Sequence, residues 1–188
     1  MTGLLGGTFN PPHYGHIALA RTAKERFGLA QLVILVAALP AYKRVELDAR
    51  TRLRLAAAAF PDDDVELDEH AYTVDALRKG GWQDPLFFVG ADQFVDFPRW
   101  KDPEGVLAEA RLAVATRPGY PRDRLEEVLR GLERQDRVTF FELEPVPISS
   151  REIRDRTARG DSIDGLVPPA VARLIEELDL YRVTPASA

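Results

Sequence analysis

Cysteine is absent from this chain of 188 residues. Its absence excludes disulfides, thiolate metal sites and a cysteine nucleophile, and it is typical of an intracellular protein. Basic charge is also in short supply, because 25 lysine and arginine residues face 30 aspartate and glutamate residues, for a formal net charge of −5. An excess of acid gives no electrostatic reason to expect binding to a nucleic-acid backbone or to an anionic membrane surface.

Long hydrophobic segments are missing as well. The longest apolar run spans residues 32–39, which is far too short to cross a bilayer and matches a buried strand in length. The first residues show neither the basic region nor the long apolar region of a secretory signal peptide. We therefore expect a cytoplasmic protein that has neither a membrane nor a nucleic acid as a partner.

The apolar residues that are present suffice for a hydrophobic core. Hydrophobic residues make up 45% of the chain and charged residues 29%, which is close to the average of globular proteins. The sequence contains no internal repeat, low-complexity tract or long linker. We expect one domain over residues 1–184 and a disordered tail over residues 185–188.

Apolar runs and amphipathic segments alternate along the chain. Runs without internal alternation are typical of strands buried on both faces, and apolar residues at helical spacing indicate helices. The predicted strands cover residues 3–6, 32–37, 65–67, 86–89, 112–115 and 138–143. The predicted helices cover residues 15–27, 49–60, 74–79, 103–110, 122–135, 150–159 and 169–178. This order predicts an α/β fold with a Rossmann-like, doubly wound and mostly parallel sheet that carries helices on both faces.

Ligands of such a sheet bind outside the carboxyl ends of the strands, near the point where the strand order reverses. The segments that follow predicted strands are therefore the first places to look for a site. They comprise residues 6–16, 39–44, 90–100 and 147–154.

The first of these segments combines glycine with histidine. Gly6 and Gly7 let the backbone approach a ligand where a Cβ would clash. His13 and His16 are three residues apart at the start of a predicted helix, so they can lie on one face at its positive end, which favours polyphosphate. Two histidines at a helix start also occur as caps or surface residues. A zinc site would need a third ligand, and the only other histidine is His70.

A second basic segment, residues 148–154, opens another predicted helix. Ser149 or Ser150 can cap this helix, and Arg154 follows one turn later. Together they offer a hydroxyl, a helix N-terminus and a guanidinium fork to a phosphate group. Taken alone, an ordinary capped helix with a solvated arginine is the simpler interpretation of this segment.

The two segments resemble the paired signatures of the nucleotidylyltransferase superfamily. Residues 6–16, GGTFNPPHYGH, resemble the first signature, and residues 148–154, ISSREIR, resemble the second. The resemblance runs almost end to end. Within the superfamily, the chain is most similar to the bacterial nicotinate-nucleotide adenylyltransferase family. The further segments that carry it are residues 71–77, 88–92, 97–100 and 166–171.

The resemblance implies an enzyme of NAD biosynthesis that joins nicotinate mononucleotide to the AMP part of ATP, forming deamido-NAD and pyrophosphate. It implies Mg²⁺ as the cofactor that arrives with ATP, held by substrate oxygens and water and not by the protein. The implied catalytic residues are His13, His16 and Arg154, with Asp92 on the adenosine ribose. The implied ATP-binding residues are Gly6, Gly7, Thr8, Phe9, Gly90, Asp92, Ile148, Ser149 and Ser150.

A further set of residues is implied for the mononucleotide: Lys43, Tyr72, Thr73, Trp100 and Arg117. Trp100 would stack on the electron-poor pyridine ring. The backbone N–H groups of Tyr72 and Thr73 and the Thr73 hydroxyl would bind the carboxylate that distinguishes nicotinate from nicotinamide. Ordinary alternatives are a rim or core aromatic for Trp100 and a plain N-cap for Thr73.

Three residues depart from the family pattern. Asn10 stands where Asp is common, Tyr42 replaces a histidine before Lys43, and Arg151 occupies a position usually held by a small hydroxyl residue. Two other functions remain open: the same chemistry on nicotinamide mononucleotide or phosphopantetheine, or nucleotide-binding regulation without turnover. The expected partners are ATP and nicotinate mononucleotide, and the expected assembly is a monomer or a homodimer.

Overall fold

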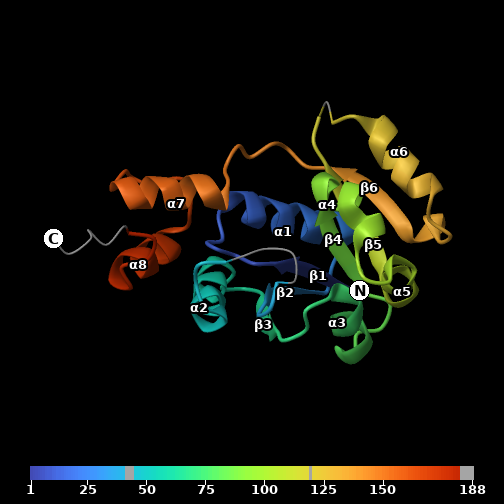
Figure 1. Cartoon of the computed structure of the whole chain (residues 1–188), viewed down its shortest axis with the longest axis horizontal. Helices are drawn as coiled ribbons and strands as arrows, with labels where there is room; N and C mark the ends of the chain where they lie inside the picture. Colours follow the sequence, from blue (N-terminus) through green and yellow to red (C-terminus); the bar gives the residue numbers. More distant parts are fainter. Residues whose placement is uncertain (41–44, 119, 183–188) are drawn as a thin grey trace.

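The computed structural model describes residues 1–40, 45–118 and 120–182 (Figure 1). The strands in these residues form a six-stranded sheet in the order β3-β2-β1-β4-β5-β6, and every neighbouring pair is parallel. The strands are β1 (Thr2–Gly7), β2 (Gln31–Ala37), β3 (Asp64–Asp68), β4 (Leu86–Gly90), β5 (Arg111–Thr116) and β6 (Val138–Glu142). The expected doubly wound α/β fold is confirmed, and the sheet, expected to be mostly parallel, is parallel throughout the described residues.

Helices cover both faces of the sheet. The α-helices are α1 (Tyr14–Phe27), α2 (Ala49–Ala59), α3 (Thr73–Lys79), α4 (Ala91–Asp96), α5 (Pro103–Glu109), α6 (Arg122–Arg130), α7 (Ser150–Arg159) and α8 (Pro169–Glu177). Two short 3-10 helices are η1 (Phe97–Arg99) and η2 (Gln135–Arg137). The helices α1, α2, α7 and α8 bury side chains in one core, and α3, α4, α5 and α6 bury theirs in a second. In Figure 1, α7 and α8 lie at one end of the molecule and α6 at the other.

Adjacent residues of a central strand enter different cores. In β1, Leu4 packs in the core that contains α3, whereas Leu5 packs in the core that contains α1. Phe87 and Phe88 of β4 divide between the two cores in the same way. Because both faces need apolar side chains, these strands are unbroken apolar runs in the sequence.

The strand order reverses between β1 and β4. From β1 the chain runs toward β2 and β3, with α1 and α2 on the first face. It then returns to β4 on the other side of β1 and continues to β5 and β6, with α3 to α6 on the opposite face. A ligand of such a sheet is expected at the carboxyl ends of β1 and β4.

The helix predicted over residues 122–135 is shorter than expected. It ends at Arg130, because the N–H groups of Gly131 and Leu132 close the last turn on the carbonyls of Val128 and Leu129. Leu132 is buried there in the second core, so the chain turns inward, and residues 135–137 form η2. The helical spacing of apolar residues does not indicate this turn, because Leu132 continues the spacing beyond the end of the helix.

The helix α4 was also missed, since residues 91–96 were expected to belong to a loop. Six residues are too few to show a helical period, and the burial of Ala91 and Phe94 in the second core holds the segment in place. Every other predicted element differs from the observed one by at most one residue at either end. The expected end of the first helix at Gly28 is confirmed, with φ at 55° in the left-handed region.

Some expectations fall outside the described residues. They concern Tyr42, Lys43 and the tail predicted over residues 185–188. Within the described ranges, no helix is long and apolar enough to cross a membrane.

Candidate functional site

The two signature segments lie against each other, although they are far apart in the sequence. The Ser150 hydroxyl donates a hydrogen bond of 2.8 Å to the carbonyl of Pro11. Arg154 Nη1 donates one of 2.9 Å to the carbonyl of Asn10. The loop after β1 and the helix α7 therefore form one site, at the carboxyl end of β1 and the start of α1 (Figure 1).

The two histidines of this site are joined through their backbone. His13 is the N-cap of α1, and its Nδ1 accepts a hydrogen bond of 3.1 Å from the Gly15 N–H. His16 Nδ1 in turn accepts one of 3.2 Å from the His13 N–H, and the two ring centroids lie 3.9 Å apart. The expectation that both rings share one face at the helix N-terminus is confirmed.

These hydrogen bonds decide which ring nitrogen carries the proton. A neutral imidazole has one donor and one acceptor nitrogen, and the nitrogen that accepts an N–H bond cannot be the protonated one. Since Nδ1 accepts in both His13 and His16, the proton of each neutral ring resides on Nε2. Both rings therefore offer an Nε2–H donor beside the N–H groups of the helix start, which is the chemistry of an anion site.

Burial keeps His13 neutral. Its side chain is 8% exposed, and desolvation lowers its pKa to about 4 from an ordinary value of 6.5. A charged imidazole loses hydration in such a place, so the neutral form is favoured. A bound polyphosphate would oppose this effect, because nearby negative charge stabilises the protonated ring.

Glycine at position 15 leaves room for the His13 ring. A Cβ built on Gly15 would lie 2.9 Å from both Cε1 and Nδ1 of His13. Gly7 has the same relation to Phe9, whose Cζ would lie 2.9 Å from an added Cβ. Side chains at either position would therefore displace a ring of the signature loop.

Phe9 supports His16 from inside the protein. Its ring is 1% exposed and packs edge-on against His16, with the centroids 5.2 Å apart. Its φ of 46° lies in the left-handed region, which is costly for a residue other than glycine and is maintained only by surrounding contacts. Since the ring is buried, only the backbone of Phe9 is placed to meet a ligand.

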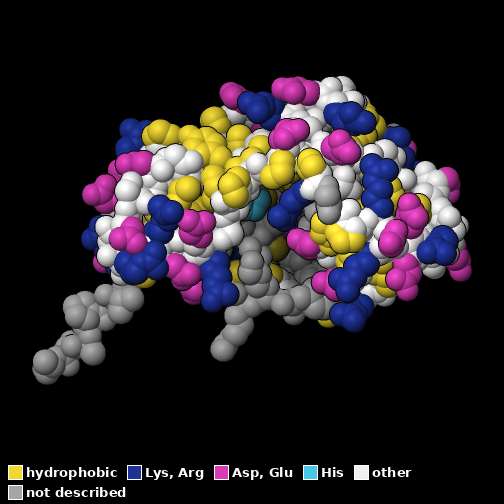
Figure 2. Space-filling model, turned by 90° about the horizontal axis from the view of Figure 1, so that it is seen from above, with side chains coloured by type: hydrophobic (Ala, Val, Ile, Leu, Met, Phe, Trp, Pro, Cys, Tyr) yellow, Lys and Arg dark blue, Asp and Glu magenta, His cyan; other side chains and the backbone are white. Residues whose placement is uncertain are grey.

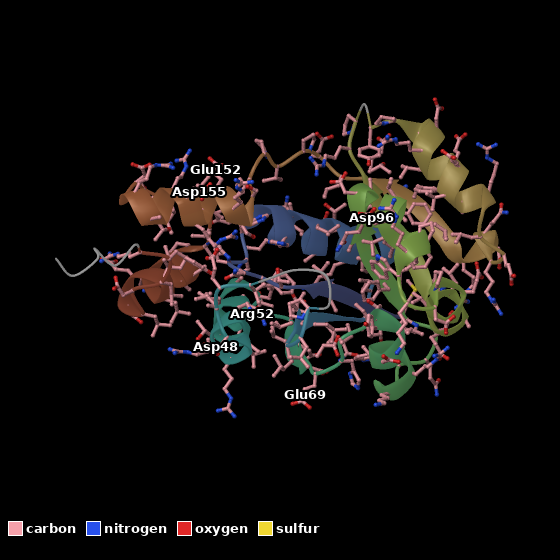
Figure 3. The ribbon with its side chains drawn as sticks, in the orientation of Figure 1. Asp48, Arg52, Glu69, Asp96, Glu152 and Asp155 are labelled. Atoms are coloured by element: carbon pink, nitrogen blue, oxygen red, sulfur yellow. The ribbon has the colours of Figure 1, made fainter. Side chains whose placement is uncertain are left out.

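The start of α7 uses its two serines differently. Ser149 is the N-cap, and its Oγ accepts a hydrogen bond of 3.1 Å from the Glu152 N–H. Ser150 is the first helical residue and contacts the loop after β1. Arg151 is 85% exposed and forms an ion pair with Asp155 along α7, at 3.8 Å. Figure 3 shows Asp155 on the outer side of this helix.

Arg154 is held between the loop and an acid. Its side chain is 20% exposed, and its Nε lies 3.3 Å from Glu46 Oε2, a carboxylate that is 62% exposed. Asn10, whose carbonyl accepts from Arg154, is buried and accepts a second hydrogen bond of 2.8 Å at Oδ1 from the Tyr181 hydroxyl. Tyr181 was not expected, because no local pattern connects a tyrosine beyond α8 with a loop after β1.

A second group of expected residues gathers at the ends of β4 and β5. Gly90 is the N-cap of α4, and Asp92 lies in its first turn with a side chain that is 72% exposed. Asp92 accepts a hydrogen bond of 3.1 Å from the Tyr120 hydroxyl and lies 3.5 Å from the guanidinium of Arg117. Tyr120 was missed, because it belongs to no motif and is adjacent to Asp92 only in the fold.

The residues expected to bind a pyridine ring lie over the second core. Trp100 packs edge-on against Phe97 at 5.3 Å and Phe87 at 6.5 Å, and it is only partly buried. Tyr72 packs against the same core and is the N-cap of α3, although its side chain does not cap the helix. Thr73 is the first helical residue, so its interpretation as the N-cap was wrong.

A hollow near the middle of one face contains histidine side-chain atoms (cyan) at its edge, with lysine and arginine side chains nearby (Figure 2). The structure thus brings His13, His16, Ser150 and Arg154 together. Asp92 and Arg117 form a second group at the ends of the neighbouring strands. Lys43 lies outside the described residues.

The chain is similar to a known family over most of its length. Residues 4–156 match the family model described as "Cytidylyltransferase-like". A protein of Thermus thermophilus named "Probable nicotinate-nucleotide adenylyltransferase" is 40% identical over 192 residues, which cover 96% of this chain and 98% of that protein. A protein of the same name from Exiguobacterium sibiricum is 36% identical over 192 residues, which cover 95% of this chain and 97% of that protein.

Solved structures share the fold. The structure titled "Plasmodium falciparum nicotinic acid mononucleotide adenylyltransferase complexed with NaAD" superposes with a TM-score of 0.74 and covers 96% of each chain at 17% identity. A second structure of that protein, complexed with APC, gives a TM-score of 0.73 at 16% identity and the same coverage. At these identities the likeness supports the fold alone.

The burial of His13 predicts an acid-sensitive stability. Its pKa is about 4 in the folded protein and 6.5 ordinarily, so between these values the unfolded chain binds a proton that the folded protein does not. The contribution of His13 to the free energy of unfolding is fully present above pH 6.5, and it is lost as the pH falls toward about 4. We expect His13→Asn, which keeps a capping side chain but does not titrate, to lose less stability across this window.

Urea unfolding at a series of pH values measures the free energy of unfolding of the wild type and of His13→Asn. For each protein, the value above pH 6.5 serves as the reference. A His13→Asn curve that falls as steeply as that of the wild type would show that another group causes the acid loss.

Proposed function

The chain belongs to the cytidylyltransferase-like family and, within it, to the nicotinate-nucleotide adenylyltransferases, and from this premise we propose how its site joins nicotinate mononucleotide to the AMP part of ATP. Its activity is that of a nucleotidyltransferase of NAD biosynthesis. The observation that carries the assignment of the site is the contact between the two signature segments, through Ser150 to Pro11 and Arg154 to Asn10.

We propose that the ATP phosphates bind at the start of α1. The Nε2–H groups of His13 and His16 would donate to phosphate oxygens, together with the N–H groups of the helix start. Gly6, Gly7, Thr8 and Phe9 would contact ATP through their backbone, since the Phe9 ring is buried and the two glycines make room for the Phe87 and Phe9 rings. Both His rings would then stabilise charge on the α-phosphate as it is attacked.

The proposed reaction is an in-line displacement. A phosphate oxygen of nicotinate mononucleotide forms a bond to the α-phosphorus of ATP, the bond from that phosphorus to the bridging oxygen breaks, and pyrophosphate leaves with the bonding electrons. A phosphate monoester has its second pKa near ~6, so the attacking group is already an anion and needs no general base. The work of the protein is to bring two anions together and to stabilise the charge on the leaving group.

Arg154 is proposed to bind the β- and γ-phosphates. Its partner Glu46 is well exposed, and such surface ion pairs are weak, so a polyphosphate can replace that carboxylate. The hydrogen bond to the Asn10 carbonyl would keep the guanidinium in place during this exchange. Ile148, Ser149 and Ser150 would approach the same phosphates at the start of α7.

Mg²⁺ is proposed to arrive with ATP as part of the substrate. It would be held by phosphate oxygens and water, as this ion usually is, and would neutralise part of the phosphate charge. The donors around the start of α1 support this division of roles, since imidazole N–H and guanidinium groups bind phosphate oxygens and not cations. Because the reaction consumes ATP, we also propose a cytoplasmic location.

The mononucleotide is proposed to bind beside the second core. Trp100 would stack on the pyridine ring, and its partial burial leaves part of the indole for a ligand. Tyr72 and Thr73 would bind the carboxylate through the start of α3, and Lys43 would contact phosphate. Asp92 would accept hydrogen bonds from the adenosine ribose beside Gly90, while Arg117 contacts the mononucleotide, so ligand binding would separate the present Asp92–Arg117 pair.

The substrate assignment predicts a preference for the acid form of the mononucleotide. With ATP and Mg²⁺, we expect pyrophosphate release to be at least about tenfold faster in kcat/KM with nicotinate mononucleotide than with nicotinamide mononucleotide, since a buried ionic contact exceeds ~1.4 kcal/mol. A coupled pyrophosphate assay measures both, with phosphopantetheine as a third acceptor. Release with phosphopantetheine alone would reassign the acceptor, and binding of ATP without release would indicate a regulator.

Loss of one histidine is expected to affect the chemical step. We predict that His16→Ala lowers kcat by at least about 100-fold, the usual scale for losing one preorganised charge-stabilising donor. His70→Ala is the matched control, because His70 pairs with Asp68 at the end of β3. Near-wild-type turnover in His16→Ala would remove His16 from the catalytic residues.

Loss of the proposed stacking residue is expected to affect binding of one substrate. We predict that Trp100→Ala raises KM for the mononucleotide by about fivefold, the equivalent of roughly 1 kcal/mol of stacking, and leaves KM for ATP unchanged. Trp82→Ala is the control, since Trp82 is also partly buried against the second core. A rise in KM for ATP instead would place Trp100 on the adenine side.

A further inference from the structure

Arg52 is a charged residue in the interior of the protein. It lies in α2 with its side chain 1% exposed, and it is among the largest side chains that are fully buried. Figure 3 places it between α2 and the strands, above the helix cap Asp48. Burial of a guanidinium is expensive unless its N–H groups are hydrogen-bonded, so its partners show what it is used for.

All the hydrogen-bond acceptors of Arg52 in the described residues are backbone carbonyls. Nε donates to Leu47 at 3.1 Å, and Nη2 donates to Ala38 at 3.2 Å. Nη1 donates twice, to Thr8 at 3.0 Å and to Ala37 at 2.6 Å. One planar guanidinium thus joins the end of β1, the end of β2 and the segment before α2.

The position of Thr8 connects the hydrogen bonds of Arg52 with the candidate site. Thr8 follows directly after β1 and precedes Phe9, whose backbone is in the costly left-handed region and whose ring supports His16. A strained conformation persists only where neighbouring contacts determine it. The charge-assisted hydrogen bond to the Thr8 carbonyl anchors the chain immediately before that residue.

We propose that Arg52 is a positioning residue for adenylyl transfer, which holds the backbone of Thr8 so that the following loop presents its N–H groups and the two histidines to the polyphosphate. The inference rests on the proposed function of the same site. Arg52 does not touch the substrate in this assignment. It acts through Thr8, and through Ala37 and Ala38 it keeps the end of β2 at a constant distance from that loop.

The fork geometry is the part of Arg52 that matters here. An ammonium group keeps the charge but cannot reach carbonyls on three segments with a planar fork. Arg52→Lys should therefore be impaired almost as strongly as Arg52→Met. If only the positive charge mattered, Arg52→Lys would restore the wild-type values.

The test compares both variants with the wild type in steady-state assays with ATP and nicotinate mononucleotide, well below the melting temperature of each. We expect KM for ATP to rise by about tenfold and kcat to fall by at least about tenfold, since small misplacements of a site are costly. KM for the mononucleotide should change by less than about twofold, because its proposed contacts lie over the second core.

Two control variants come from the same helix. Leu55→Ala removes a fully buried side chain in the first core, so it should lower Tm without changing KM for ATP. Arg54→Met removes an exposed arginine and should change neither quantity. The assignment is overturned if Arg52→Met keeps the wild-type KM and kcat, or if Leu55→Ala reproduces its kinetic changes. It is also overturned if neither Arg52 variant folds while Leu55→Ala does, since Arg52 would then be a general folding determinant.

Calorimetric binding of inorganic tripolyphosphate separates this inference from the proposed function. We expect tripolyphosphate to bind the Arg52→Lys variant about tenfold more weakly than the wild type. A wild type that binds the probe but lacks turnover with both substrates would refute the proposed function, while weaker binding by the variant would still support Arg52. Normal turnover in the wild type with unchanged binding and kinetics in both Arg52 variants would refute the role of Arg52 alone.

Discussion

The sheet is buried on both faces, and this constraint decides where the protein can carry polar chemistry. Leu4 and Leu5, or Phe87 and Phe88, fill different cores, so the central strands have no face left for a ligand. Polar groups gather instead where the strands end. The backbone carbonyls at the strand ends need hydrogen-bond donors there. The buried guanidinium of Arg52 donates to those at the ends of β1 and β2.

The site depends on backbone hydrogen bonds as much as on side chains. The N–H groups of Gly15 and His13 each donate to an imidazole Nδ1, so the proton of each neutral ring resides on Nε2, at a helix start. The same arrangement needs glycine beside the His13 ring and a buried Phe9 behind His16. Because the reaction brings two anions together, such local donors matter more than the net charge of −5, which gives no indication of them.

Much of the fold could be predicted because its signals are local. Apolar runs located the central strands such as β2 and β4, and helical spacing located most helices to within one residue at either end. The exceptions have physical reasons. The helix α6 ends at Arg130 although Leu132 continues the apolar spacing, since that leucine turns into the second core. The helix α4 has six residues and is held by the burial of Phe94, which no period can report.

The candidate site was predictable in part for the same reason. His13 and His16 share a short segment, so their spacing and the following helix were enough to place both rings on one face. Tyr120 and Tyr181 could not be found in this way, because they meet Asp92 and Asn10 only after the chain has folded. The Ser149 cap and the contact of Ser150 with Pro11 were likewise indistinguishable in the sequence, where either serine could begin α7.

The sequence by itself determined the α/β class, the order of most elements and the two signature segments, since each of these is encoded by neighbours along the chain. Only the tertiary structure decided that α7 lies against the loop after β1, and that Arg52 is buried. In the sequence Arg52 is one of several arginines on an amphipathic helix. Its role follows from carbonyls of Thr8 and Ala37, which are distant in the chain and adjacent only because parallel strands end at one edge of the sheet.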